Sequence, residues 1–297
     1  MYPIGCDFSS FNQIPLDRFE LYANSADFFI NRVGIVFYRR GWAIDHTAEQ
    51  RFEVIRSVSP KMPLGVYFLP HGSILRYLTP SQRMNLSTHP FMKPLFEVLA
   101  RLKPAFFAID LEEHTVRESN HGEAVLAYTD LYMNLLLGME RGDIPRMKIG
   151  VYSRASWINQ FPVLRKHIEN DERLFIWTAN WLRGKVTTLE SIQNLREVQP
   201  KGLPIPFGTN YKRRKPVTFH QFAGDSGLQY RFRDFSPNKS MDMNAYIGTL
   251  DEMLSDFNEK SPLEQLDSLF EDVLNGNFED KNAVLETYRS LRRLLKW

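Results

Sequence analysis

An uninterrupted apolar run that ends directly in two acids limits what this chain can fold into more than any other stretch. Residues Ala105 to Ile109 are all apolar, as in a parallel strand covered on both faces, and Asp110 and Glu112 follow at once. Side chains two residues apart on a strand point the same way, so both carboxylates are expected on one face at the strand's carboxyl end. Folds of alternating strands and helices place their chemistry at that end.

The two carboxylates suit acid–base chemistry. Carboxylates this close repel each other when both are ionised, so the pKa of one rises and it can hold a proton near neutral pH. A proton donor beside an anion is what cleavage of a glycosidic bond requires. The structural alternative is that Asp110 caps a following helix while Glu112 and Glu113 are solvated loop charges. This stretch alone leaves both interpretations open.

Strands and helices alternate along most of the chain. Short apolar runs predict strands at residues 4–9, 28–38 with a break at 31–32, 64–69, 105–110, 147–152, 174–180, 205–207 and 217–222. Helical periodicity separates several of them, at residues 16–26, 47–58, 94–102, 123–140 and 157–168. This rhythm predicts an α/β fold with a parallel sheet, and so many strands favour a closed barrel over an open sheet.

The end of the chain has a different pattern. From Asn244 onward the apolar residues recur at helical spacing, so residues 250–297 are predicted to form a short helical appendage. We expect it to pack on the barrel or on a partner, because so short a segment is poorly suited to fold alone. The predicted domains are a barrel over 1–249 and a helical tail over 250–297 that serves packing, targeting or attachment.

Charge is unevenly divided between these two parts. Residues 250–297 hold 11 acidic and 6 basic residues, a balance of −5, so the net charge of +2 for the whole chain leaves +7 for residues 1–249. A basic body suits an anionic target such as a bacterial wall or nucleic acid. The basic loop 212–215 is interpreted as solvated, with contact to an anionic wall polymer as the alternative. No glycine-rich phosphate loop is present, and nucleic acid is not an expected partner.

The composition of the chain argues against disulfides, metal sites and membrane spans. Cys6 is the only cysteine, which excludes a disulfide framework and a thiolate metal cluster within one chain. His114 and His220 have no partners at metal-ligand spacing, so a zinc site is not expected. No apolar run approaches the roughly 20 residues that span a bilayer. The first residues do not resemble a signal peptide, so we expect a soluble protein that is made in the cytoplasm and does not insert stably into a membrane.

Acids that are distant in the sequence converge in a barrel. The carboxyl ends of its strands meet at one rim, where Asp7 ends the first strand and Asp110 and Glu112 follow the fourth. Asp242 lies just beyond the last predicted strand, and Trp177 lies on the sixth. Four carboxylates with aromatic rings describe a carbohydrate site, because rings stack on sugar faces while acids perform the chemistry.

Seven short segments, which together cover residues 4 to about 248, share a recognisable order and spacing. The segments are Gly5-Cys6-Asp7-Phe8-Ser9, Gly65-Val66-Tyr67-Phe68, Ile109-Asp110-Leu111-Glu112, Gly150-Val151-Tyr152, Ile176-Trp177-Thr178-Ala179, Gln221-Phe222 and Met241-Asp242-Met243-Asn244. In this order and spacing they resemble glycoside hydrolase family 25, the muramidase lysozymes of bacteria and their phages.

The resemblance implies an irregular, TIM-like β/α barrel that hydrolyses the β-1,4 bond between N-acetylmuramic acid and N-acetylglucosamine with retention of configuration. It implies that Glu112 is the general acid/base and that Asp110 stabilises the developing positive charge, directly or by orienting the substrate's acetamido group. Asp7 and Asp242 match the flanking acids. The substrate-binding residues it implies are Tyr67, Tyr152, Trp177, Gln221 and Arg32. The resemblance implies neither a metal nor another cofactor.

The chain departs from the family pattern at three positions. Phe68 stands where the family often has histidine, Arg32 replaces a frequent lysine, and His220 replaces the aromatic residue before the glutamine. Arginine keeps the charge of lysine but changes the geometry. None of these changes removes a carboxylate.

Two functions from different classes remain open, and another retaining barrel glycosidase is a third alternative. The first is an active muramidase that reaches the wall after release, as a phage or prophage lysin or as part of a virion. The second is a barrel that binds wall glycan or serves as a virion structural module without cleaving, with the helical tail contacting a wall polymer or virion protein. The four carboxylates favour the first, because a pure binding site has no need to crowd them.

Overall fold

The computed structural model describes most of the first 257 residues of the chain. The described residues are 2–37, 41–70, 78–90, 92–112, 121–171, 173–179, 217–224, 235 and 241–257. The chain divides into two compact units, Met1–Phe257 and Asn258–Trp297. The first unit contains all of the strands and helices described below.

Eight of the described strands close into a barrel. They are β1 (Ile4–Phe8), β2 (Phe28–Phe37), β4 (Leu64–Leu69), β5 (Phe106–Asp110), β6 (Lys148–Arg154), β7 (Phe175–Ala179), β8 (Phe219–Ala223) and β9 (Asp242–Tyr246). Neighbours from β1 to β8 pair in parallel, while β9 runs antiparallel between β8 and β1. The pairing of β1 with β2 closes the ring. A short outer strand, β3 (Gly41–Ile44), forms a hairpin with β2.

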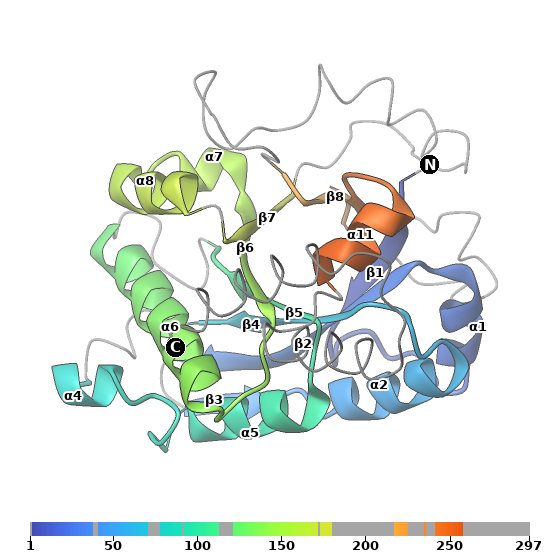
Figure 1. Ribbon diagram of the computed structural model, residues 1–297, viewed down its shortest axis with the longest axis horizontal. Helices are drawn as coiled ribbons and strands as arrows, with labels where there is room; N and C mark the ends of the chain where they lie inside the picture. The colour runs from blue at the N-terminus through green and yellow to red at the C-terminus, as the bar shows by residue number, and fades with distance from the viewer. Residues whose placement is uncertain are drawn as a thin grey trace, which may run out of the picture. The chain divides into compact units, whose positions relative to one another are not determined.

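Helices lie around the outside of these strands (Figure 1). They are α1 (Arg18–Ser25), α2 (Thr47–Val58), α4 (Pro80–Arg83), α5 (Lys93–Leu102), α6 (His121–Arg141), α7 (Ala155–Ile158) and α8 (Pro162–Asn170). A further helix, α11 (Leu250–Phe257), packs against rings inside the barrel. Outward side chains of the strands, such as Cys6, Phe68 and Val151, pack in one large apolar core with helix residues such as Phe52 and Leu99. Burial of this surface is the main force that holds the helices to the barrel.

The predicted α/β barrel is confirmed, and the structure corrects several details. Residues 28–37 form one continuous strand, with an irregularity in pairing between Arg32 and Gly34. The helix expected at 157–168 is two helices, and Pro162 begins the second. The sheet is not wholly parallel, because β9, which the sequence pattern did not predict, is antiparallel. The strand predicted at 205–207 lies outside the described residues.

Aromatic rings fill the interior of the barrel below the rim that the carboxyl ends of the parallel strands form. Inward-facing Gly5, Gly65 and Gly150 each adjoin a phenylalanine ring of the next strand, and a Cβ built on them would lie 2.4, 1.9 and 2.3 Å from the nearest atoms. No side chain fits there, so glycine is required for close packing. The interior rings are Phe28, Phe106, Phe175, Phe219 and Tyr246.

Helix α11 completes this aromatic layer. Phe257 stacks on Phe219, with centroids 5.3 Å apart and planes at 15°, and its centroid lies 4.5 Å from that of Phe106. Met253 is buried in the same cluster. The sequence assigned residues 250–257 to the tail, but the structure packs this helix into the barrel's compact unit. The function of the remaining tail, residues 258–297, stays a prediction.

Candidate active site

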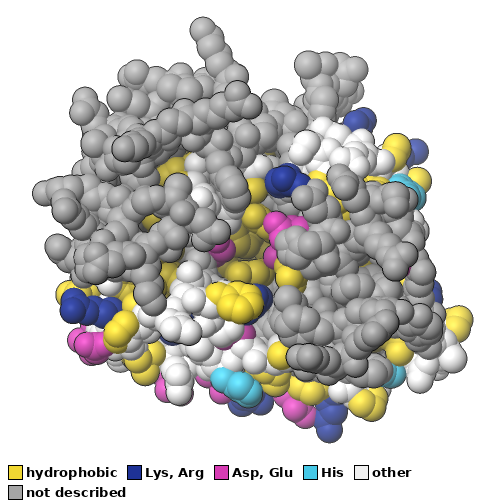
Figure 2. All heavy atoms as spheres, turned by 180° about the vertical axis from the view of Figure 1, so that it is seen from behind, with side chains coloured by type: hydrophobic (Ala, Val, Ile, Leu, Met, Phe, Trp, Pro, Cys, Tyr) yellow, Lys and Arg dark blue, Asp and Glu magenta, His cyan; other side chains and the backbone are white. Residues whose placement is uncertain are grey.

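The carboxyl ends of the parallel strands and the amino end of β9 form one rim of the barrel. Asp7 on β1 lies opposite Asp242 on β9 in the strand register, because β9 runs the other way. Asp110 ends β5, and Glu112 follows two residues later. On the face seen in Figure 2, acidic side chains lie beside hydrophobic ones near the centre. The structure thus brings acids from three distant segments to one end of the barrel.

Amides hold Asp7 in place beneath this rim. Its Oδ2 accepts hydrogen bonds from Asn244 Nδ2 at 2.7 Å and from Gln221 Nε2 at 3.0 Å. Asn244 and Gln221 face each other across the β8–β9 pair, and Asn244 is fully buried. Two fixed donors orient the carboxylate and favour its charged form.

Aromatic side chains support these amides from below. Trp177 Nε1 donates to Asn244 Oδ1 at 2.8 Å, and Tyr152 Oη donates to Gln221 Oε1 at 2.9 Å. The Trp177 ring packs against Tyr152, with centroids 4.5 Å apart, and edge-on against Tyr67 at 5.9 Å. The acids at the rim therefore rest on a rigid layer in which each buried polar group named here has a partner.

Burial dominates the electrostatics of Asp7. Desolvation raises its pKa well above the ordinary value, and the negative charges of Asp242 and, more weakly, Glu112 raise it further. The hydrogen bonds from Asn244 and Gln221 act in the opposite direction and lower the pKa. Taken together, these effects leave Asp7 easier to protonate than a carboxyl group in water.

Asp110 is perturbed in the same direction. Burial raises its pKa well above the ordinary value, and the charges of Glu112 and Asp7 add to the rise. Its Oδ1 is buried and has no hydrogen-bond partner among the described residues. Arg32 opposes the rise by favouring the charged form. The cluster therefore holds a proton more readily than isolated carboxylates do, and one cation works to keep Asp110 ionised.

Arg32 is fixed by the segment that follows β3. It lies beside Tyr67 in the register of β2 and β4, and it is only 7% exposed. Its Nη2 donates to Ser10 Oγ at 3.1 Å and lies 3.5 Å from Asp45 Oδ2. Asp45 in turn accepts hydrogen bonds from Thr47 Oγ1 at 2.5 Å and from the Thr47 amide at 3.2 Å. Both charges of this buried pair are therefore held by neighbouring polar groups.

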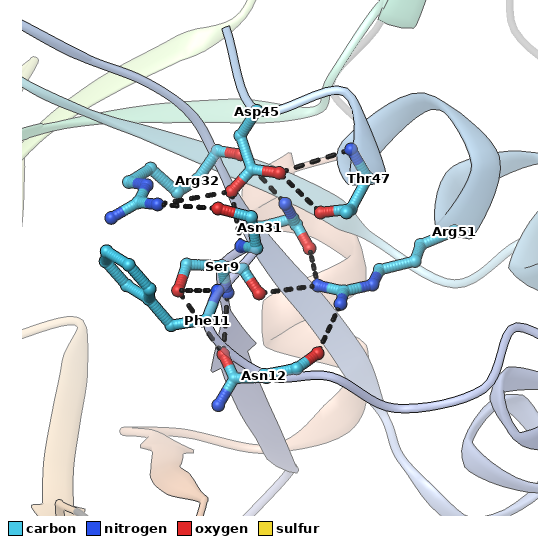
Figure 3. A network of polar contacts seen from close by, with 9 residues as sticks. Ser9, Phe11, Asn12, Asn31, Arg32, Asp45, Thr47 and Arg51 are labelled. Carbon is cyan, nitrogen blue, oxygen red and sulfur yellow. Dashed lines mark hydrogen bonds and ion pairs between the residues drawn. The ribbon is translucent and has the colours of Figure 1, made fainter. Parts of the chain in front are cut away.

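A second arginine anchors the loop that follows β1 (Figure 3). Arg51 of α2 donates to the Ser9 carbonyl at 3.1 Å, to the Asn12 carbonyl at 2.7 Å and to Asn31 Oδ1 at 2.8 Å. Burial lowers the pKa of Arg51 to about 10, and the charge of Asp45 opposes that change. Arg51 stays protonated at neutral pH, so the loop is tied to the helix by a permanent cation.

Depth separates the predicted site residues into two groups. Tyr67, Glu112 and Asp242 are half-buried, whereas the others lie deeper. Trp177 is 1% exposed, which does not fit the prediction that its ring contacts substrate directly, because neither face is open. Its ring instead supports Tyr67 and Tyr152. The catalytic and binding roles inferred from the sequence stay predictions.

Sequence reasoning gave no role to several residues of this site, above all Asn244, although Asn244 ends one of the segments that resemble the family. Asn244 lies two residues after Asp242, and this spacing could have indicated that both share one face of a strand. The partners of Arg32 at Ser10 and Asp45 were also missed, because they come from separate loops. Phe68 and His220 are two of the positions at which the chain departs from the family pattern. Both are buried, on strands whose inward positions are Tyr67 and Gln221. They therefore face away from the acids.

Nothing in the described part of the chain indicates a metal centre. Among the described residues, no group of three or more histidine, cysteine or acidic side chains has the geometry to hold a metal ion. None of the described helices is long and apolar enough to cross a membrane.

Comparisons with known proteins give a match in structure. No protein-family model and no curated protein matches the sequence. A glycosyl hydrolase 25 of Streptococcus pneumoniae, described as a virulence factor that participates in host cell invasion, superposes with a TM-score of 0.54 at 14% identity, over 86% of this chain and 92% of that one. A bacterial lysozyme from Streptomyces coelicolor gives a TM-score of 0.48 at 13% identity, over 87% and 98%. The protein has the barrel fold of a glycosyl hydrolase 25, the family that its sequence motifs resemble.

Proposed function

We propose that this protein is a peptidoglycan hydrolase, an N-acetylmuramidase that cleaves the β-1,4 bond between N-acetylmuramic acid and N-acetylglucosamine with retention. The observation that carries the proposal is the burial of Asp7 and Asp110 at a rim that also holds Glu112 and Asp242. Crowded, desolvated carboxylates destabilise a fold, so their presence is explained by chemistry rather than by stability.

The roles follow from depth and environment. Glu112 is half-buried and therefore within reach of a glycosidic oxygen, so it acts as the general acid and later as the base. Asp110 lies deeper, and Arg32 favours its anionic form, so it stabilises the positive charge that develops on the sugar. Asp7, fixed by Asn244 and Gln221, holds the geometry of the site from beneath.

The fold likeness supports this proposal, because the matched S. pneumoniae protein is itself a glycosyl hydrolase 25. The order of the seven sequence segments supports it independently, since each of the four acids falls in a matching segment. The substrate proposed is therefore bacterial peptidoglycan, and the described residues supply the acids for its hydrolysis.

The deciding experiment is digestion of purified peptidoglycan by the wild type and by Glu112→Gln. Fragments are reduced with borohydride and identified by mass spectrometry. We expect reduced muramitol ends from the wild type, and a loss of at least about 100-fold in the variant, because the general acid is gone. Glu53→Gln, an exposed position on α2, is the matched control and should cleave like the wild type.

Other products would change the assignment. Reduced glucosaminitol ends would identify a glucosaminidase, and full activity of a folded Glu112→Gln would remove Glu112 from its role. If neither protein releases fragments but both are retained on walls, the barrel is a binding module.

A further inference from the structure

Phe11 is the most exposed large hydrophobic residue in the described part of the chain. Its side chain is 78% exposed, and it is the one aromatic residue among the exposed large hydrophobics there. It lies four residues after Asp7, on the loop that leaves β1 at the acidic rim. A phenylalanine in such a position loses apolar contact with the core and gains none from water.

One face of the Phe11 ring is supported by a cation. The Arg32 guanidinium carbon lies 4.9 Å from the ring centroid. Figure 3 draws the two side chains side by side. This distance is within the range of a cation–π interaction. Arg32 is itself buried and held by Asp45 and Ser10, so it is a fixed support. The high exposure of Phe11 leaves the rest of its ring open to solvent.

The loop that carries Phe11 is held in one conformation. Ser9 N donates to Asn12 Oδ1 at 2.7 Å, and Asn12 N donates to the Ser9 carbonyl at 3.0 Å. Arg51 binds the carbonyls of the same two residues, and Ser10 N donates to Asp45 Oδ2 at 2.6 Å. A rigid aromatic ring binds at lower entropic cost than one that must first be ordered.

Arg32 also connects this ring to the acids. It lies next to Tyr67 in the strand register and is near enough to Asp110 to favour ionisation of that carboxyl group. The Arg32 guanidinium therefore lies beside the Phe11 ring and also acts electrostatically on Asp110. Phe11 follows Asp7 by four residues on the loop that leaves the same end of β1, so a polymer that extends past the acids is expected to reach it.

We propose that Phe11 is a platform on which a hexosamine ring of the glycan strand stacks, beyond the two sugars whose bond is cleaved. The inference rests on the proposed function for the identity of the strand. The apolar face of a pyranose ring packs flat on an aromatic ring, and Arg32 and the anchored loop hold that ring ready. A single exposed apolar side chain is common on protein surfaces, but the Phe11 ring packs on a buried arginine and lies on the loop that leaves the acidic rim.

The inference predicts that the effect of Phe11 depends on substrate length. The specificity constant kcat/KM is measured for Phe11→Ala on polymeric glycan strands and on the shortest fragment that the wild type cleaves. The ratio compared is kcat/KM on the polymer divided by kcat/KM on the short fragment. We expect this ratio to be about tenfold lower in Phe11→Ala than in the wild type, mainly through a higher KM on the polymer, because only the polymer reaches the ring. Phe11→Trp should restore the ratio, since indole offers a larger stacking surface.

Leu21→Ala is the matched control, because Leu21 is exposed on the outer face of α1 and should leave the ratio unchanged. Melting temperatures of all variants check that each is folded. An unchanged ratio in Phe11→Ala, or an equal loss on both substrates, would overturn the inference while the proposed hydrolysis stands.

Retention on purified walls separates this inference from the proposed function. If the wild type cleaves nothing but is retained, and Phe11→Ala is retained at least several-fold less, hydrolysis fails and the platform stands. If retention is absent, or is the same in both proteins, the platform is overturned as well.

Discussion

Asn244 donates to Asp7 across the seam where the last strand of the barrel meets the first, over 2.7 Å. The same amide accepts a hydrogen bond from Trp177 at 2.8 Å, so both ends of the Asn244 side chain are committed. The orientation of a rim carboxylate is thereby coupled to barrel closure.

Replacing Asn244 with alanine should damage both stability and activity. Asp7 would lose its shortest donor and Trp177 Nε1 its acceptor, both in a buried setting. We expect a loss of about 2–4 kcal/mol in the free energy of unfolding and a fall in activity of about 100-fold. Urea denaturation and wall digestion measure the two effects. Asn24→Ala, at an exposed amide of α1, should change neither.

Asp110→Asn is expected to raise stability while it lowers activity. The folded protein holds a proton on Asp110 at pH values where the unfolded chain has released it, because burial raises the pKa. Stability therefore falls as pH rises from the ordinary carboxyl value of about 4 through the raised pKa. Asparagine does not ionise, so the variant should melt a few degrees higher at neutral pH, and the difference should vanish near about pH 4.

Thermal melts of the Asp110→Asn variant over this pH range test the sign. Asp17→Asn, at an exposed position before α1, serves as the control. A variant that is less stable than the wild type at neutral pH would show that the charge of Asp110 is compensated in the fold.

Arg32→Gln should move the pH profile of activity. Arg32 lowers the pKa of Asp110, so its removal raises that pKa further. If Asp110 acts as an anion, activity is lost as pH falls through its pKa, and the acidic limb of kcat/KM should move to higher pH. Arg32→Lys keeps the charge and should stay closer to the wild type. Arg18→Gln, on the exposed side of α1, is the control, and identical limbs in all variants would refute the coupling.

Two truncations should differ sharply. A chain that ends at Phe257 keeps the rings that pack on Phe106 and Phe219, so its barrel should fold. A chain that ends at Thr249 loses Met253 and Phe257 from the core. Loss of one buried phenylalanine alone costs about 3–5 kcal/mol, so the shorter chain should unfold at lower temperature or be insoluble. Circular dichroism melts distinguish the two, and equal stability would contradict the packing role of α11.

The sequence predicted those parts of the fold in which local pattern and burial agree. β5 is an apolar run because it is covered on both faces, and it was predicted within a residue. β9 was missed because its inward residues include Asp242 and Asn244, which face a polar rim rather than an apolar interior. Its outward residues, Met243 and Ala245, alternate with them as a strand requires, but so short a signal is weak.

Residue types indicated the acids of the site, but not their partners. Asn31 and Arg32 interrupt an apolar run, so they were interpreted as a break in the strand. In the structure Asn31 accepts a hydrogen bond from Arg51 of α2, while Arg32 reaches Asp45, and the strand continues through both. These partners lie 20 and 13 residues away. Long-range pairs of this kind leave no local pattern.

The three inward glycines, Gly5, Gly65 and Gly150, have a consequence for how a polymer can be handled. Because these glycines have no side chain, phenylalanine rings pack against them and, together with Phe257, fill the lower part of the barrel. Nothing as wide as a sugar strand threads through such a barrel. If the protein cleaves glycan as proposed, the strand would lie across the rim, and both products would leave on the side from which the strand arrived.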